Sequence, residues 1–263
     1  MPDAAATWSP APGVAHRLAR TRFHDVRHFT RVDSTNRYLL TEATRPDGVV
    51  ALADEQTAGR GRHGRTWSAT PGAALLVSAR LRPQLPPERL HVVTLAAAVA
   101  ATDAVRTVAG FEPRLKWPND LVVDDRKLAG ILAEADGGGA VVVGMGLNLR
   151  ADAYPAELAA TATACDEHAP RAVDRDELLV AWLQSFDAHL DALDDVVSTA
   201  AARSATLGRA VRIELAHDTF TGRATRMTAE GYLVVTRDDG TDAVVTAGDV
   251  VHLRPVTDRL PGS

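Results

Sequence analysis

The first segment whose residue types could do chemistry is residues 57–67, TAGRGRHGRTW, in which glycines alternate with arginines before a tryptophan. Glycine lets backbone N–H groups approach an anion closely, and arginine offers forked donors to carboxylates and phosphates. The spacing differs from the GxxxxGK[ST] loop of nucleoside triphosphatases. We therefore expect an anion-binding loop, with a solvated surface loop or an Arg-Gly patch for nucleic acid as the alternatives.

A second candidate feature is a pair of lysines. Of the 29 lysine and arginine residues, only Lys116 and Lys127 are lysines. Ammonium and guanidinium groups suit different sites, so a chain this rich in arginine is expected to keep lysine where arginine would fail. Lys116 begins KWPND, in which Pro118 sets a rigid corner that presents Asn119 and Asp120. A polar turn between a helix and a strand is the alternative.

Two further segments combine glycine with a polar residue. Lys127 heads the apolar run KLAGIL, where Gly130 predicts close approach of a ligand or another backbone. Residues 144–148, GMGLN, follow an apolar run and end in Asn148. They lack the third glycine of dinucleotide-binding folds, which argues against a nicotinamide cofactor. A lysine in solvent at a strand end and a simple bulge are the alternatives here.

Hydrophobic patterning predicts the elements that must position these residues. Ser34 precedes Thr35 and Asn36 at the start of a capped helix. Strands are expected over residues 48–55, 72–81, 121–123, 127–135 and 140–143, and a long core helix over residues 86–108. Asp174 and Glu177 resemble a capping box ahead of a second core helix. Alternating residues and glycine turns after residue 207 predict a small all-β domain.

Composition limits the classes of protein that remain. A net charge of −5 argues against a protein that coats nucleic acid through general positive charge. The single cysteine, Cys165, cannot form an intrachain disulfide, which fits a reducing compartment. Residues 1–13 are expected to be a flexible tail without signal-peptide features. We expect no membrane span, because no apolar run approaches the roughly 18 residues that one needs.

The segments GRGRHGRTW, KWPND, KLAGIL and GMGLN, with STN ahead of them, resemble the biotin protein ligases in order and spacing. The resemblance covers about Val32 to Arg254. It implies an α+β fold, with a mixed-sheet catalytic domain of the biotin/lipoyl protein ligase type over residues 14–205 and a small SH3-like β-barrel over residues 206–256. It implies a short form without an N-terminal DNA-binding domain, because the segment before Ser34 is too short for one.

The activity that the resemblance implies has two steps. ATP and biotin give biotinyl-5′-AMP and pyrophosphate, and a lysine of a biotin carboxyl carrier domain then attacks the mixed anhydride and releases AMP. The first step brings a carboxylate to an anionic phosphate, a repulsion of about 4 kcal/mol for unit charges about 4 Å apart at an effective dielectric constant of about 20. Fixed cations must offset this repulsion, while no protein nucleophile is required.

The resemblance also implies site residues. Those implied for biotin are Ser34, Thr35, Asn36, Gln56, Gly59, Arg60, Gly61, Arg62, Lys127 and Gly130. Those implied for ATP and the adenylate are Arg62, Arg65, Trp67, Lys116, Asn119 and Asn148, with Trp67 on the adenine ring and Asn148 at its edge. Lys127, Arg62 and Asp120 are the implied catalytic residues, and Asp120 orients the carrier amine. Mg²⁺ is expected to arrive with ATP, and the protein is assigned no metal ligands of its own.

Two other readings stay open at this point: a lipoate-type protein ligase of the same fold, and a non-catalytic biotin sensor or RNA-binding protein. The expected partners are the carrier domains of acyl-CoA or pyruvate carboxylases, with no DNA and no membrane, and the expected location is the cytoplasm. Residues 57–67 are expected to be mobile without ligand and to order over biotinyl-5′-AMP.

Overall fold

The structure is a computed structural model that describes residues 9–41, 46–86, 89–215, 218–246 and 248–252. Its helices are α1 (Pro12–Arg17), α2 (Thr35–Leu40), α3 (His91–Ala109), α4 (Arg175–Asp191) and α5 (Leu193–Ala202), with short 3-10 helices at Arg62–Gly64, Ala151–Ala153, Ala156–Leu158 and Cys165–Glu167. Its strands are β1 (Ser9–Pro10), β2 (Asp25–Val32), β3 (Val49–Gln56), β4 (Ala74–Leu81), β5 (Arg114–Lys116), β6 (Asp120–Val123), β7 (Arg126–Ala135), β8 (Val141–Asn148), β9 (Ala210–Glu214), β10 (Thr219–Met227), β11 (Leu233–Thr236), β12 (Asp242–Val245) and β13 (Asp249–His252).

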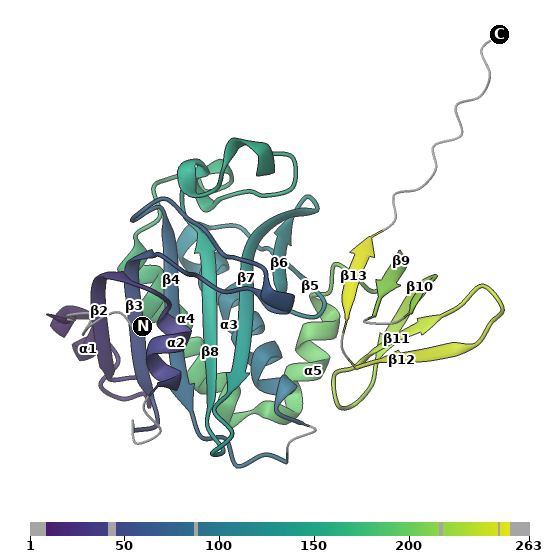
Figure 1. Ribbon diagram of the computed structural model, residues 1–263, viewed down its shortest axis with the longest axis horizontal. Helices are drawn as coiled ribbons and strands as arrows, with labels where there is room; N and C mark the ends of the chain where they lie inside the picture. The colour runs from purple at the N-terminus through teal and green to yellow at the C-terminus, as the bar shows by residue number, and fades with distance from the viewer. Residues whose placement is uncertain (1–8, 42–45, 87–88, 216–217, 247, 253–263) are drawn as a thin grey trace, which may run out of the picture.

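Two sheets organise these elements (Figure 1). The larger has eight strands in the order β1-β2-β3-β4-β8-β7-β6-β5, and only β2 and β3 run parallel. The smaller has five antiparallel strands in the order β12-β11-β10-β9-β13. The predicted mixed α+β fold with a small C-terminal β domain is confirmed. The described part of that domain is an antiparallel sheet, in which β12 and β13 are the two edges.

The eight-stranded sheet buries both of its faces because alternate residues of each strand point to opposite sides. On β3, Val50 and Leu52 belong to the core formed with α3, α4 and α5. Val49 and Ala51 belong to the smaller core under α2. Figure 1 shows α2 on one side of the sheet and α3 with α4 on the other. The polar residues at the start of α2 are therefore held against the sheet face that faces away from the long helices.

Helix α3 is the centre of the larger core and corrects one expectation from the sequence. Among the described residues it is the one helix whose length and composition would suit a membrane crossing, with a mean hydropathy of 1.5. The expectation that no apolar run approaches that length is wrong by this measure. Most of that apolar segment, 72%, is buried inside the protein, where α3 packs against α4 and α5. The many alanines of α3 allow this close packing, and the Trp182 indole of α4 donates to the Ala97 carbonyl over 3.1 Å.

Several local predictions can be compared with the elements observed. The predicted strands correspond to β3, β4, β6, β7 and β8, and the predicted long helix begins at His91, later than residue 86. Ser34 caps α2 by accepting from the Arg37 N–H, and Asp174 caps α4 by accepting from the Glu177 N–H. Of the predicted tail, residues 9–10 form β1 and residues 12–13 begin α1, while residues 1–8 lie outside the described residues.

Trp117 joins the two sheets. Its side chain is 5% exposed and belongs to the core of the smaller sheet, with Val211, Ile213 and Leu233. The indole N–H donates to the Gly231 carbonyl over 3.1 Å. Trp117 follows β5 directly, so the edge of the large sheet carries the residue around which the small sheet packs.

A buried ion pair at the far end of β4 leads to a prediction about stability. The Arg80 side chain is fully buried, and its guanidinium lies 2.7 Å from the carboxylate of Asp136, which is 5% exposed. Hydrogen bonds from Arg80 and then from the Ala140 and Gly138 N–H groups lower the pKa of Asp136 to about 2. This contribution to stability is present above the ordinary carboxyl pKa and is lost as the pH falls toward 2.

Asp136→Asn keeps an oxygen for the two backbone N–H groups but removes the negative charge that lies beside the buried guanidinium of Arg80. We expect the free energy of unfolding at pH 7, measured by urea titration, to fall by about 3 kcal/mol. The difference from the parent should shrink between pH 4 and pH 2. Arg80→Met added to Asp136→Asn should recover part of the loss, and equal stability of the Asp136→Asn variant and the parent at pH 7 would contradict this account.

Candidate functional site

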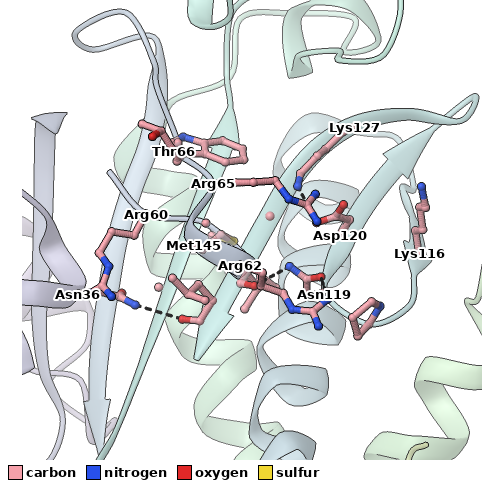
Figure 2. Close-up of a pocket in the computed structure, with 18 of the residues that line it drawn as sticks. Asn36, Arg60, Arg62, Arg65, Thr66, Lys116, Asn119, Asp120, Lys127 and Met145 are labelled. Carbon is pink, nitrogen blue, oxygen red and sulfur yellow. Dashed lines mark hydrogen bonds and ion pairs between the residues drawn. The ribbon is translucent and has the colours of Figure 1, made fainter. Parts of the chain in front are cut away.

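A cavity of about 540 Å³ lies where α2, residues 56–67, strands β5 to β8 and β13 meet. Its lining includes most of the residues that the sequence singled out, namely Ser34, Thr35, Asn36, Gln56, Arg60, Gly61, Arg62, Arg65, Trp67, Lys116, Asn119, Asp120, Lys127 and Gly130. Its apolar wall includes Val77, Ile131, Leu132 and Met145. Figure 2 shows Asn36 and Arg60 on one side of this cavity and Lys116 on the opposite side.

Glycines on adjacent strands form the floor of the cavity. Gly130 on β7 is in register with Gly146 on β8 and with Asp120 on β6. A Cβ on Gly146 would lie 2.3 Å from the Trp67 indole, and a Cβ on Gly144 would lie 2.1 Å from Asn36 Oδ1. Side chains at these positions would therefore exclude Trp67 and Asn36 from the sheet.

The first turn of α2 supplies the polar end of the cavity. Gln56 Oε1, at the end of β3, accepts from the Thr35 N–H over 2.8 Å and from the Thr35 hydroxyl over 3.0 Å. Asn36 donates to the carboxylate of Glu134 over 2.8 Å, and its Oδ1 accepts from the Ser78 hydroxyl over 2.6 Å. These bonds hold several short polar side chains in fixed orientations beside an apolar wall.

Residues 59–67 form a closed hairpin. The Trp67 N–H donates to the Gly59 carbonyl, and the Gly61 N–H donates to the Arg65 carbonyl. His63 at the tip has a φ of 54°, in the left-handed region. Arg60 extends to the polar end, where its guanidinium lies 2.9 Å from Glu134. The hairpin therefore covers the cavity from the polar end toward β13.

The arginines at the other end of the hairpin meet the C-terminal sheet. Arg62 donates to the Gly248 carbonyl and to Asn119 Oδ1, each over 3.2 Å. Asp249 at the start of β13 pairs with Arg65 and lies 3.7 Å from Arg62. Burial lowers the pKa of Arg62, opposed by Asp120 and reinforced by Arg65. This contact with β13 was not foreseen from the sequence, because the segment around Asp249 carries no motif.

Lys127 lies at the centre of the site. Its ammonium forms an ion pair with Asp120 Oδ1 at 2.7 Å and lies 5.6 Å from the centre of the Trp67 ring. A Cβ on Gly130 would be 3.0 Å from the same nitrogen. Lys116 also lines the cavity, and its pKa is lowered by burial and by Lys127 against the opposing effect of Asp120. Figure 2 shows Lys127 and Asp120 pointing toward each other, with Arg65 directed toward them.

The electrostatic balance of the site differs from that of the whole chain. Among the described lining residues are the cations Arg60, Arg62, Arg65, Lys116 and Lys127, and the carboxylates Asp120, Glu214 and Asp249. The cavity is thus positive, whereas the chain as a whole has a net charge of −5. A positive, partly enclosed cavity concentrates anions. The arrangement can therefore hold a ligand with a polar end, an apolar middle and an anionic end.

Two predicted site residues do not line this cavity. Gly59 lies in the turn behind it, where a Cβ would be 2.3 Å from the Trp67 carbonyl oxygen. Asn148 at the end of β8 is buried, and its amide donates to the Thr163 carbonyl over 2.9 Å. The Thr163 N–H in turn donates to the Lys127 carbonyl. Both residues thus support the backbone of the site in this structure.

Residues missed by the sequence reasoning are of two kinds. Ser78 on β4 and Glu134 on β7 hold the polar end through their bonds to Asn36, and the sequence predicted both strands but did not connect either side chain with the site. Glu214 and Asp249 come from the C-terminal sheet, at positions 214 and 249, far along the chain from every motif. Only the packing of the two sheets around Trp117 brings them to the cavity.

Comparison with known proteins agrees with this geometry. Residues 28–149 match the model of the biotin/lipoate A/B protein ligase family, and residues 206–253 match that of the biotin protein ligase C-terminal domain. The biotin–[acetyl-CoA-carboxylase] ligase of Mycobacterium tuberculosis is 38% identical over 84% of this chain and 86% of its own length. That of Paracoccus denitrificans is 40% identical over 70% and 80%.

A solved structure has the same arrangement of elements. The biotin protein ligase of Aquifex aeolicus in complex with biotin and ATP superposes with a TM-score of 0.79 at 25% identity, over 88% of this chain and all of that one. With a sequence and a fold shared along most of its length, the chain belongs to the biotin protein ligase family.

Proposed function

We propose that this protein activates biotin with ATP to biotinyl-5′-AMP and transfers biotin to a lysine of a biotin carboxyl carrier domain. The observation that carries the proposal is the order of groups along one cavity: hydrogen-bonding side chains at α2, an apolar wall, then Lys127 among further cations. Biotin has the same order, with a polar ureido head, an apolar ring and chain, and a carboxylate. The name of the Mycobacterium tuberculosis relative specifies the same transfer.

The proposed roles follow the geometry of the site. Ser34, Thr35, Asn36 and Gln56 bind the ureido group. Lys127 and Arg62 offset the negative charge that builds up as the biotin carboxylate attacks the α-phosphorus and pyrophosphate leaves.

In the second step the carrier amine attacks the acyl carbon and AMP leaves. Asp120 is placed beside Lys127 to orient that amine and accept its proton. Arg65, Lys116 and Asn119 bind the nucleotide. Mg²⁺ is proposed to arrive bound to ATP, where it would offset phosphate charge, and Asp120 and Asn119 would offer it oxygen atoms of the type that it takes.

We assign the binding of biotin and ATP to a catalytic domain over residues 14–205. The C-terminal domain over residues 206–256 is proposed to contribute the remaining wall of the cavity. The proposed carriers are those of acyl-CoA or pyruvate carboxylases. A cytoplasmic location is proposed because the single cysteine, Cys165, can form no intrachain disulfide, which fits a reducing compartment. Its thiol is buried, and burial raises its pKa to about 12, so it is a poor nucleophile.

The function itself is tested by biotin-dependent exchange of pyrophosphate into ATP. Exchange with lipoate and none with biotin would favour the lipoate-type ligase of the same fold. The match of residues 206–253 to the C-terminal domain of biotin protein ligases favours biotin. Binding of biotin without exchange or transfer would indicate a sensor.

Lys127→Arg is expected to lower transfer of biotin to a carrier domain by about tenfold or more although the charge is kept. The ammonium lies between Asp120, the Trp67 ring and the backbone of Gly130, and a planar guanidinium needs a different space. Lys127→Ala, which removes the charge altogether, is the control and should lower transfer further. Near-normal biotinylation by the Lys127→Arg variant would contradict the role proposed for this lysine.

Trp67→Ala is expected to raise the KM for ATP about tenfold, since a base–aromatic stack contributes about 1–3 kcal/mol. Trp67→Phe should retain most of the affinity. The readout is the KM for ATP and the KM for biotin, measured separately. An increase confined to the KM for biotin would instead make the ring part of the biotin wall.

Asp249→Asn is expected to loosen the hairpin, because it removes the charge that pairs with Arg65 and lies near Arg62. Trypsin should cleave after the hairpin arginines faster than in the parent, and the KM for ATP should fall because those arginines are freed for phosphates. Biotin with ATP should protect both forms. Asp242→Asn, which alters an exposed ion pair with Arg226 in the same sheet, is the matched control. A rate of trypsin cleavage that changes neither with the Asp249→Asn substitution nor on addition of biotin and ATP would contradict this role.

A further inference from the structure

A second group of polar side chains links the two sheets outside the cavity lining, and we call it the β13 bridge: Asp125, Thr206, Arg209 and His252. Arg209 donates to the Asp125 carboxylate over 2.6 Å and to His252 Nδ1 over 3.1 Å. His252 Nε2 lies 3.1 Å from the Thr206 hydroxyl, which also accepts from the Trp117 N–H over 3.1 Å. Thr206 is fully buried, and the His252 side chain is 9% exposed.

The donors and acceptors of the β13 bridge can be assigned. Arginine is always protonated, so His252 Nδ1 must accept from Arg209. The proton of the neutral ring therefore lies on Nε2 and is donated to Thr206. Burial, together with the positive charges of Lys116 and Arg209, lowers the pKa of His252 to about 4, against an opposing effect of Asp125. The ring is thus neutral at pH 7, as the acceptor role requires.

The two ends of the bridge meet the two segments that carry the lysines. Trp117, whose N–H is bound by Thr206, directly follows Lys116. Asp125 lies in the β6–β7 turn with a φ of 63°, two residues before Lys127. The backbone of Arg209 is itself fixed, since its carbonyl accepts from the Ala224 N–H of β10.

We propose that Arg209 is a positioning residue for the ligase reaction, acting through Asp125 on the segment of Lys127 and through His252 and Thr206 on the segment of Lys116. The inference rests on the function proposed above. A lysine side chain is long and flexible, so the placement of its charge depends on how firmly its backbone is held. Misplacement of a catalytic group by about 1 Å can cost on the order of a hundredfold in rate.

The test is a double-mutant cycle on biotinyl-5′-AMP formation under single-turnover conditions, where slow variants can still be followed. Arg209→Ala should lower the rate at saturating substrates about tenfold. It should leave the KM for biotin within about twofold, because the polar end of the site lies on the opposite side of the cavity. In a Lys127→Ala background the same substitution should cost a smaller fold-loss than in the parent, because one of the two groups that it positions has gone.

Two further variants make the outcome decisive. Asp125→Asn removes the charge that faces Arg209 while tolerating the left-handed backbone. It should reproduce part of the rate loss expected for Arg209→Ala. It replaces Arg209→Ala in the test if that variant folds poorly. Arg226→Ala breaks a comparable exposed ion pair of the same sheet, with Asp242, and should leave the rate unchanged.

The inference and the proposed function fail in different ways. If the parent protein makes no biotinyl-5′-AMP, the proposed function is wrong. If the parent is active but Arg209→Ala and Asp125→Asn are as fast as the parent, the positioning role is overturned. An equal fold-loss from Arg209→Ala in the parent and in the Lys127→Ala background would overturn it as well.

Discussion

The site depends first on the absence of side chains along one row of the large sheet. Gly130 and Gly146 face each other across β7 and β8, and Gly144 lies two residues away on the same face. Their surface lets the Trp67 indole and Asn36 approach the sheet to distances that a Cβ would forbid. The cavity is therefore made by glycine backbone below, the arginine hairpin above and α2 at the side. A larger residue at any of these glycines would displace the side chains that pack on the row, such as Trp67 and Asn36, and would change the shape of the cavity.

Trp117 sets the second constraint, because it is a residue of one sheet that fills the core of the other. Fixing the C-terminal sheet at this point brings β13 over the hairpin, where Asp249 meets Arg65. The boundary between the two predicted domains therefore runs through the site. Cations from the large sheet and its hairpin are balanced by carboxylates from both sheets. The carboxylates offset part of the positive charge of the hairpin arginines. The cavity nevertheless stays positive, as two anionic substrates require.

Much of this could be predicted from sequence, and the limits have physical causes. Strands and helices with strong periodicity were located because each buries a face, and the motifs were located because glycine, arginine and lysine have specific chemical uses. The contacts of Asp249 with the hairpin could not be predicted, since they depend on how two sheets pack rather than on local pattern. Asn148 shows a second use of one side chain: the family resemblance implies an adenine contact, and in this structure its amide N–H also holds Thr163. A residue type indicates what a side chain can do, and packing decides which of those things it does.

The positions of the two lysines give a physical reason for the scarcity of lysine in this chain. Both lysines line the cavity, in a chain that otherwise uses arginine. For Lys127 the space is limited by Gly130, Trp67 and Asp120 together. An arginine elsewhere in the site makes forked contacts with carbonyl and amide oxygens, as Arg62 does with Gly248 and Asn119. The choice between the two cations therefore follows the shape of the acceptor: a fork where protein oxygens surround the charge, and a point charge at Lys127, where the proposed function brings carboxylate and phosphate together.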